Sequence, residues 1–147
     1  MKMSTLWFKN YSLAEVNDIF AKYMTGFLEI QATQIDSNLL VAQMPVTDRV
    51  KQPFGLLHGG ASVVLAESVG SVASNMIIDN SKYVGVGMEI NANHLRSVSS
   101  GIVNAYCTPV HIGRTSHVWD IRIKDEQQQP VCISRLTVAI IKKNNSF

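Results

Sequence analysis

The segment from Pro53 to Ile78 constrains the fold of this chain more than any other part of the sequence. It begins with a Pro-Phe-Gly loop, passes through His58-Gly59-Gly60 and then continues without a breaker strong enough to stop a helix. Ten of the sixteen residues from Gly59 to Ser74 are Gly, Ala or Ser. An interior glycine such as Gly70 destabilises a helix by about 1 kcal/mol, so close packing against its backbone must compensate. We therefore predict a long buried helix inside a sheet. A membrane span is disfavoured, because Glu67 and several serines interrupt the apolar run.

The remaining segments read as one short helix and six strands. A Ser12-Leu-Ala-Glu15 capping box predicts a helix from Leu13 to Met24 that Gly26 ends. Strands are predicted over 27–35 and 39–46, joined by a turn at 36–38, and over 83–90, 102–108, 119–124 and 131–141. The order helix, two strands, long helix, four strands predicts an α+β fold, with an antiparallel sheet and its helix on one face. We expect residues 1–147 to form one domain, with a frayed tail over 142–147.

Composition excludes several classes of protein. Thirteen Lys and Arg against eleven Asp and Glu give a net charge of +2, well short of the basic excess of a non-specific nucleic-acid binder. Cys107 and Cys132 stand alone and form neither a disulfide framework nor a metal motif. The four histidines at 58, 94, 111 and 117 lack metal-ligand spacing, so no metal is expected. The first ten residues hold no apolar run long enough for a signal peptide, which predicts a cytoplasmic protein.

Glu67 is the residue most suggestive of chemistry. It is the only Asp, Glu, Lys or Arg from Gln52 to Ile78, and burying an unpaired carboxylate is costly. It could instead reach solvent or a partner charge. Gly59 and Gly60 could offer free amides at a helix start, where an anion or a polarised carbonyl oxygen binds, or could simply form a tight turn. Gly59 and Glu67 are about 12 Å apart along a helix, so one copy of each cannot grip the same atom. Two antiparallel copies could.

A second asymmetry lies further along the chain. The 28 residues from Ile90 to His117 contain no Asp or Glu, but they include Arg96 and Arg114. Two arginines are too few for a nucleic acid, but they suit a ligand that carries a few phosphates. The alternative is a weakly charged sheet edge with no ligand.

These motifs together resemble a known family. Gln52-Pro-Phe-Gly-Leu-Leu-His58-Gly59-Gly60 with Glu67, followed by Glu89-Ile-Asn-Ala-Asn-His94-Leu-Arg96-Ser97, resembles the hotdog-fold acyl-CoA thioesterases. The branch is that of the 4-hydroxybenzoyl-CoA and 1,4-dihydroxy-2-naphthoyl-CoA thioesterases, and the similarity runs from about Leu6 to Ile141. The resemblance implies a long central helix wrapped by a curved antiparallel sheet. It also implies a homodimer, usually paired into a tetramer, with active sites shared at the dimer interface.

The resemblance also implies roles for individual residues. Glu67 would be the nucleophile or general base, and the Gly59 amide would polarise the thioester carbonyl. His58 and Gln52 of the facing subunit would orient that carbonyl and the water, and Ser71 would help to hold the water. The CoA arm and its phosphates would be lined by Gly87, His94, Leu95, Arg96, Ser97, His111, Ile112, Gly113, Arg114, Thr115 and Ser116. Coenzyme A is part of the substrate, and no separate cofactor is expected.

Two other functions stay open at this point. A dehydratase or hydratase of the same fold would exchange protons with the acyl chain without hydrolysis, and a non-enzymatic module would bind acyl-CoA without turnover. The acyl group is also open. Aromatic CoA esters, the dihydroxynaphthoyl ester of menaquinone synthesis, and medium-chain or carrier-protein thioesters all fit the sequence.

Overall fold

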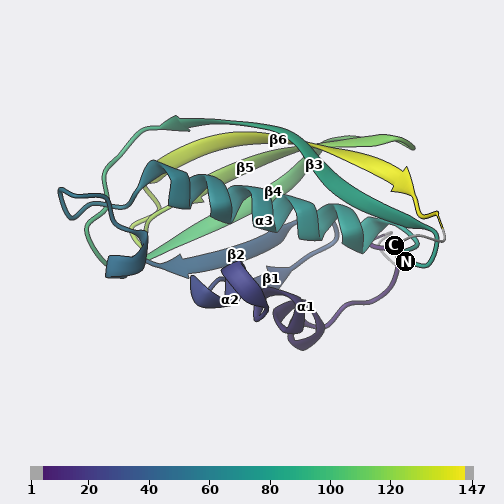
Figure 1. Ribbon diagram of the computed structural model, residues 1–147, viewed down its shortest axis with the longest axis horizontal. Coiled ribbons are helices and arrows are strands. Elements are labelled where there is room, and N and C mark those ends of the chain that lie inside the picture. Colours follow the sequence, from purple (N-terminus) through teal and green to yellow (C-terminus); the bar gives the residue numbers. More distant parts are fainter. Residues whose placement is uncertain (1–4, 145–147) are drawn as a thin grey trace.

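The computed structural model describes residues 5–144 and consists of a long helix packed in a curved sheet (Figure 1). Three α-helices and a short 3-10 helix accompany the sheet: α1 (Leu13–Phe20), α2 (Tyr23–Phe27), η1 (Asp48–Val50) and α3 (Gly59–Ile77). The six strands among the described residues are, in chain order, β1 (Gln31–Ile35), β2 (Leu40–Pro45), β3 (Tyr83–His94), β4 (Ile102–Ile112), β5 (Ser116–Lys124) and β6 (Pro130–Lys142), and η1 and α3 lie between β2 and β3. The predicted α+β architecture, a long central helix and a curved antiparallel sheet, is confirmed.

The helix α3 is buried because small residues let the sheet come close to its backbone. A side chain at Gly70 would place its Cβ 2.5 Å from Leu136 Cδ2 of β6 and 3.1 Å from Ile121 Cδ1 of β5. Around this contact, Leu65, Val69 and the two sheet residues belong to one apolar core. The low helix propensity of the segment is thus balanced by burial against the sheet.

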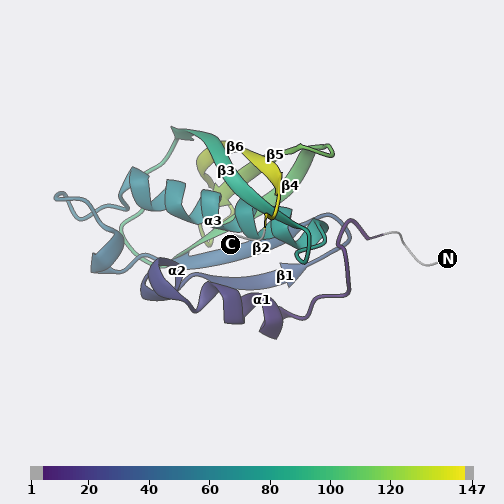
Figure 2. The same cartoon turned by 45° about the vertical axis from the view of Figure 1, so that its right-hand side comes forward.

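The sheet order is β1-β2-β4-β5-β6-β3, and every neighbouring pair of strands is antiparallel. Turning the view shows how the strands curve around α3, with α1 and α2 beside β1 (Figure 2). The strand β3 is outermost, and β6 is its only partner strand among the described residues. In β5, buried residues alternate with less buried ones along the strand, as in a sheet with one face on the core and the other towards solvent.

The N-terminal helix differs from its prediction. The structure ends α1 at Phe20, and α2 begins at Tyr23, whose φ of 53° lies in the left-handed region. Gly26 lies inside α2 rather than ending the helix. A side chain at this position would collide with the Ala21 carbonyl of the preceding turn, which explains the glycine. The predicted strand over 27–35 accordingly starts only at Gln31.

The C-terminal strands are longer than predicted, and the expected fraying does not begin at residue 142. Lys142 pairs with Tyr83 in the sheet. The Lys143 backbone N–H donates to the Lys82 carbonyl (2.8 Å), and its Nζ donates to the Asn80 carbonyl (2.8 Å). These bonds hold a stretch that its polar composition alone suggests is loose. Residues 145–147 of the predicted tail lie outside the described residues. Between residues 5 and 144, no helix is long and apolar enough to cross a membrane.

Candidate active site

The N-terminus of α3 offers one free amide rather than the two expected from its glycines. His58 is the N-cap residue, and its Nδ1 accepts the Gly60 N–H at 2.8 Å. Within residues 5–144, no acceptor takes the Gly59 N–H. The bond to Gly60 uses the Nδ1 lone pair, so a neutral His58 carries its proton on Nε2 as a second donor. The positive end of the helix dipole reinforces both donors.

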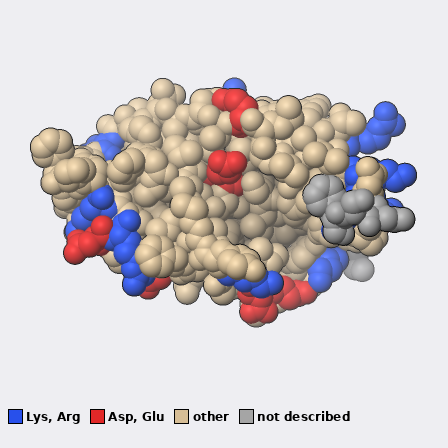
Figure 3. All heavy atoms as spheres, in the orientation of Figure 1, with Lys and Arg blue, Asp and Glu red and all other residues tan. Residues whose placement is uncertain are grey.

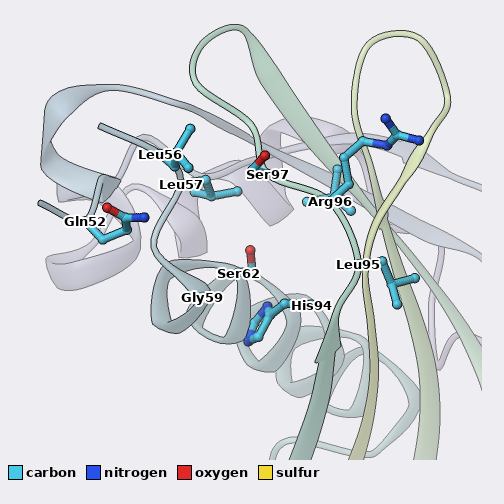
Figure 4. A pocket seen from close by; sticks show the side chains of 10 residues that line it. Gln52, Leu56, Leu57, Gly59, Ser62, His94, Leu95, Arg96 and Ser97 are labelled. Carbon is cyan, nitrogen blue, oxygen red and sulfur yellow. The ribbon is translucent and has the colours of Figure 1, made fainter. Parts of the chain in front are cut away.

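A pocket of about 400 Å³ opens beside this helix start (Figure 4). Four separate segments meet there: the loop before α3, the first turn of α3, the end of β3 with the residues after it, and the start of β6. The pocket is lined by Gln52, Leu56, Leu57, Gly59, Ser62, His94, Leu95, Arg96, Ser97 and Val131. Six of the residues predicted from the sequence are therefore brought together, namely Gln52, Gly59, His94, Leu95, Arg96 and Ser97.

Several hydrogen-bonding groups surround the Gly59 amide in this pocket. Gln52 Oε1 accepts the Phe54 N–H, which leaves the Gln52 Nε2 group as a donor, and Figure 4 shows that nitrogen on the side of Gly59. The ring of His94 lies against Gly59 so closely that a Cβ there would come within 2.8 Å of His94 Nε2. Such a cluster of polar groups around one free amide can stabilise a carbonyl oxygen on which negative charge develops.

Glu67 lies in the middle of α3, against β3. A Cβ at Gly87 would come within 2.6 Å of Glu67 Oε1, so only glycine fits beside the carboxylate as it stands. The register of β3 shifts between Gly87 and Glu89, which marks a bulge next to this contact. Among the described residues, no hydrogen bond or ion pair reaches the half-buried Glu67 carboxylate. On this face of the molecule, isolated acidic groups stand in a broad uncharged surface (Figure 3).

The other predicted catalytic residue on α3, Ser71, lines a different pocket. This pocket is smaller, about 200 Å³, and lies between α3 and the N-terminal segment; it is lined by Tyr11, Ile19, Ser71, Val72, Asn75, Met76 and Asn80. Glu67 lines neither this pocket nor the one at Gly59. Within one chain, the carboxylate and the free amide are therefore not brought together.

Of the predicted CoA-contacting residues, Gly87 lies beside Glu67 in the middle of α3, and the others divide between the two ends of this helix. His94 to Ser97 lie at its N-terminal end. The run from His111 to Ser116 forms the β4–β5 turn at the other end, where Ile112, Gly113 and Arg114 line a pocket of about 240 Å³ together with Ile77 and Ile78. A helix of 19 residues separates them, and such a helix is about 28 Å long. One chain does not present both groups to the same end of a ligand.

Some residues of these pockets were missed by sequence reasoning. Ser62 is three residues after Gly59, so helical periodicity alone places it on the same face. Leu57 and Val131 carry no such signal, because their positions depend on how the loop before α3 and the start of β6 pack. The same holds for Tyr11 and Asn75 in the smaller pocket.

His117 has a structural environment rather than a catalytic one. It is buried beside Ser74 of α3, with 3.1 Å between His117 Nδ1 and Ser74 Oγ, and the same hydroxyl accepts the Trp119 Nε1–H at 2.7 Å. Burial holds the pKa of His117 below its usual range, and the neighbouring His111 lowers it further, while the Gly113 backbone partly opposes both. In the part of the chain that the structure describes, no group of three or more His, Cys, Asp or Glu could hold a metal ion.

Comparison with protein families identifies the class to which this fold and site belong. The model of the thioesterase superfamily matches residues 54–132, more than half of the chain. The chain belongs to the thioesterase superfamily, and it is a hotdog-fold thioesterase, as the sequence resemblance predicted.

Individual relatives cover nearly the whole chain. The putative esterase PA1618 of Pseudomonas aeruginosa is 49% identical over 93% of this chain and 94% of its own length. The 1,4-dihydroxy-2-naphthoyl-CoA hydrolase of Escherichia coli is also 49% identical, over 92% of this chain and 99% of its own. Among solved structures, a mutant of thioesterase PA1618 superposes with a TM-score of 0.92 at 47% identity, over 95% of this chain and all of the other. Thioesterase HI1161 from Haemophilus influenzae also superposes with a TM-score of 0.92, at 40% identity, over 97% of this chain and all of the other.

Proposed function

We propose that this protein hydrolyses an aromatic or related acyl-CoA thioester to the free acid and CoA. The observation that carries the proposal is the carboxylate of Glu67, which has no partner among residues 5–144, on the same helix as a donor-lined pocket at Gly59. Thioester hydrolysis needs these two parts, a nucleophile or base and a place for the developing oxyanion. The first substrate to test is 1,4-dihydroxy-2-naphthoyl-CoA, because the Escherichia coli relative is named for its hydrolysis.

Each residue then has a defined task. The Gly59 N–H donates to the thioester carbonyl oxygen, where one preorganised donor contributes about 3–4 kcal/mol to the transition state. Gln52 Nε2 and His58 Nε2 orient the carbonyl and the water, and Ser71 helps to hold the water. As a base, Glu67 takes a proton from that water while the water oxygen adds to the carbonyl carbon, and the carbon–sulfur bond then breaks to give the free acid. As a nucleophile, Glu67 itself adds to the carbonyl carbon, the carbon–sulfur bond breaks to leave a mixed anhydride, and the water hydrolyses this anhydride to the free acid and Glu67. In both routes the CoA thiolate leaves and takes up a proton.

We also propose that each active site is shared by two chains. Antiparallel packing of α3 on its counterpart would bring Glu67 of one chain next to Gly59 and Gln52 of the other. It would also bring the His111–Ser116 turn of one chain near His94 to Ser97 of its partner. The outer strand β3, which pairs only with β6 among the described residues, is a free edge through which two sheets can join. We expect such dimers to pair into a tetramer in the cytoplasm, with no metal or separate cofactor.

The catalytic proposal is tested on Glu67. Benzoyl-CoA is incubated with the protein, and the released thiol is measured with a disulfide reagent. We expect Glu67→Ala to lose several orders of magnitude in kcat with an unchanged circular dichroism spectrum, and Glu67→Asp to fall between. Near-normal turnover by Glu67→Ala would rule out the assigned role.

The same assay separates the alternatives. A dehydratase or hydratase would change the acyl chain without releasing thiol. A binding module would show no turnover, and Glu67→Gln would leave its affinity for benzoyl-CoA unchanged. Rates across a panel of aromatic, dihydroxynaphthoyl, medium-chain and carrier-protein thioesters identify the acyl group.

Mixing two inactive variants tests the shared site. In a heterodimer of Glu67→Ala and Gln52→Ala chains, one of the two shared sites keeps both residues. After subunit exchange, half of the dimers are mixed, so we expect about a quarter of the wild-type activity to return. If the site lay within one chain, every site would lack one of the residues and no activity would return.

A further inference from the structure

Ser62 is a buried hydroxyl without a partner. Ser62 is only 2% exposed, yet its side chain makes no hydrogen bond within residues 5–144. No side-chain nitrogen or oxygen of the described residues is both fully enclosed and unpaired. The Ser62 oxygen therefore keeps a small opening, and the space that Ser62 lines is the pocket beside Gly59.

The same helix contains a contrasting serine. Ser74 is fully buried as well, but its hydroxyl accepts the Trp119 Nε1–H and lies 3.1 Å from His117 Nδ1. Ser74 joins α3 to β5 and has an evident structural task. Ser62 makes no such bond among residues 5–144, so its hydrogen bonding is left to water or a ligand in the pocket, and the hydroxyl adds less to stability than that of Ser74.

The helix geometry shows where that hydroxyl acts. Side chains on an α-helix point back towards its N-terminus, so Ser62 covers the turn that contains Gly59, three residues earlier. Figure 4 shows the Ser62 oxygen pointing from α3 towards the space between Leu57 and Ser97, which also line the pocket.

We propose that Ser62 is a further hydrogen-bond donor to the thioester carbonyl oxygen, next to the Gly59 N–H and in addition to Gln52 and His58 of the site proposed above. This inference rests on the proposed thioesterase function and adds a residue to it. The hydroxyl hydrogen points at the oxygen that becomes negatively charged when the nucleophile adds, so the bond is stronger in the transition state than in the ground state.

The test compares Ser62→Ala, Ser62→Cys and Ser62→Thr by benzoyl-CoA kinetics and thermal unfolding. We expect Ser62→Ala and Ser62→Cys to lower kcat about tenfold with little change in KM, because one neutral hydrogen bond is lost from the transition state. Ser62→Thr keeps the hydroxyl and should retain most of the activity. We also expect Ser62→Ala to raise the Tm by about 2 °C, since it removes an unpaired buried group and adds a better helix former.

Ser74→Ala is the matched control for stability. It removes a buried hydroxyl from the same helix but leaves two buried partners unpaired, so its Tm should fall. An unchanged kcat in Ser62→Ala, or a raised KM with normal kcat, would overturn the assignment to the carbonyl oxygen. So would a fall in Tm with lost activity that Ser62→Thr does not restore. If the wild-type protein released no thiol, the thioesterase function itself would fail, which is a distinct result.

Discussion

The contact between Gly87 and Glu67 allows the position of a catalytic group to be perturbed without touching its chemistry. In Gly87→Ala, the new Cβ would start 2.6 Å from Glu67 Oε1, whereas ordinary Cβ contacts begin near 3.4 Å. The carboxylate oxygen must therefore move by about 0.8 Å. A displacement of about 1 Å in a reacting group can lower the rate about 100-fold. We expect kcat/KM for benzoyl-CoA to fall about 30- to 100-fold.

The stability of this variant should change little, because the crowded atom is the far end of a flexible side chain. Gly85→Ala is the matched control, two residues earlier on the same face of β3. Its Cβ would come 3.1 Å from Asn75 Nδ2 and 3.2 Å from Val138 Cγ1, away from Glu67. Gly85→Ala should therefore lose some stability but stay within about threefold of the wild-type rate. If Gly87→Ala were as active as Gly85→Ala, the glycine would not be positioning the carboxylate, and the reasoning would be refuted.

Three further outcomes follow from the packing. Gly70→Ala should lower the free energy of unfolding in urea by about 1–3 kcal/mol, because its Cβ meets Leu136; an unchanged midpoint would contradict the close approach. Ser12→Ala should lower the free energy of unfolding by about 1 kcal/mol, since it removes the side chain that accepts the Glu15 N–H. An unchanged free energy of unfolding would show that the capping box does not stabilise the protein. Because the pKa of His117 is lowered in the folded protein, this histidine is protonated in the unfolded chain at a higher pH than in the folded one. The free energy of unfolding should therefore fall between pH 7 and pH 5, and it should fall less in His117→Asn. Equal pH dependence of the two proteins would contradict this.

The sequence was most informative where the composition of a short segment decides whether that segment must be buried. The run of small residues after Gly59 predicts a buried helix because only a closely packed sheet can stabilise it, and Gly70 against Leu136 is that contact. The isolated charge at Glu67 stands out because an unpaired carboxylate in an apolar helix is costly. By contrast, the predicted helix from Leu13 to Met24 is interrupted at residues 21 and 22, because the chain turn there depends on contacts that periodicity does not record.

The details of the site depended on pairings between distant segments. Which glycine amide stays free was decided by a side chain, since His58 takes the Gly60 N–H and leaves that of Gly59. The position of β3 along α3 decided that Gly87 lies beside Glu67 and that His94 lies beside Gly59. No local pattern encodes such a register, because it results from the packing of the whole sheet.

The sequence by itself determined the long helix, the order of helices and strands along the chain, the lone carboxylate and the family resemblance, because each depends on residues that are close together in the chain. The helical rise also predicted from the sequence that Glu67 and Gly59 are too far apart within one chain to contact the same atom. Only the tertiary structure decided that the two phosphate-suited segments lie at opposite ends of α3. The physical reason is the rigidity of the helix: its fixed rise per residue holds these groups apart, whatever the side chains could otherwise do.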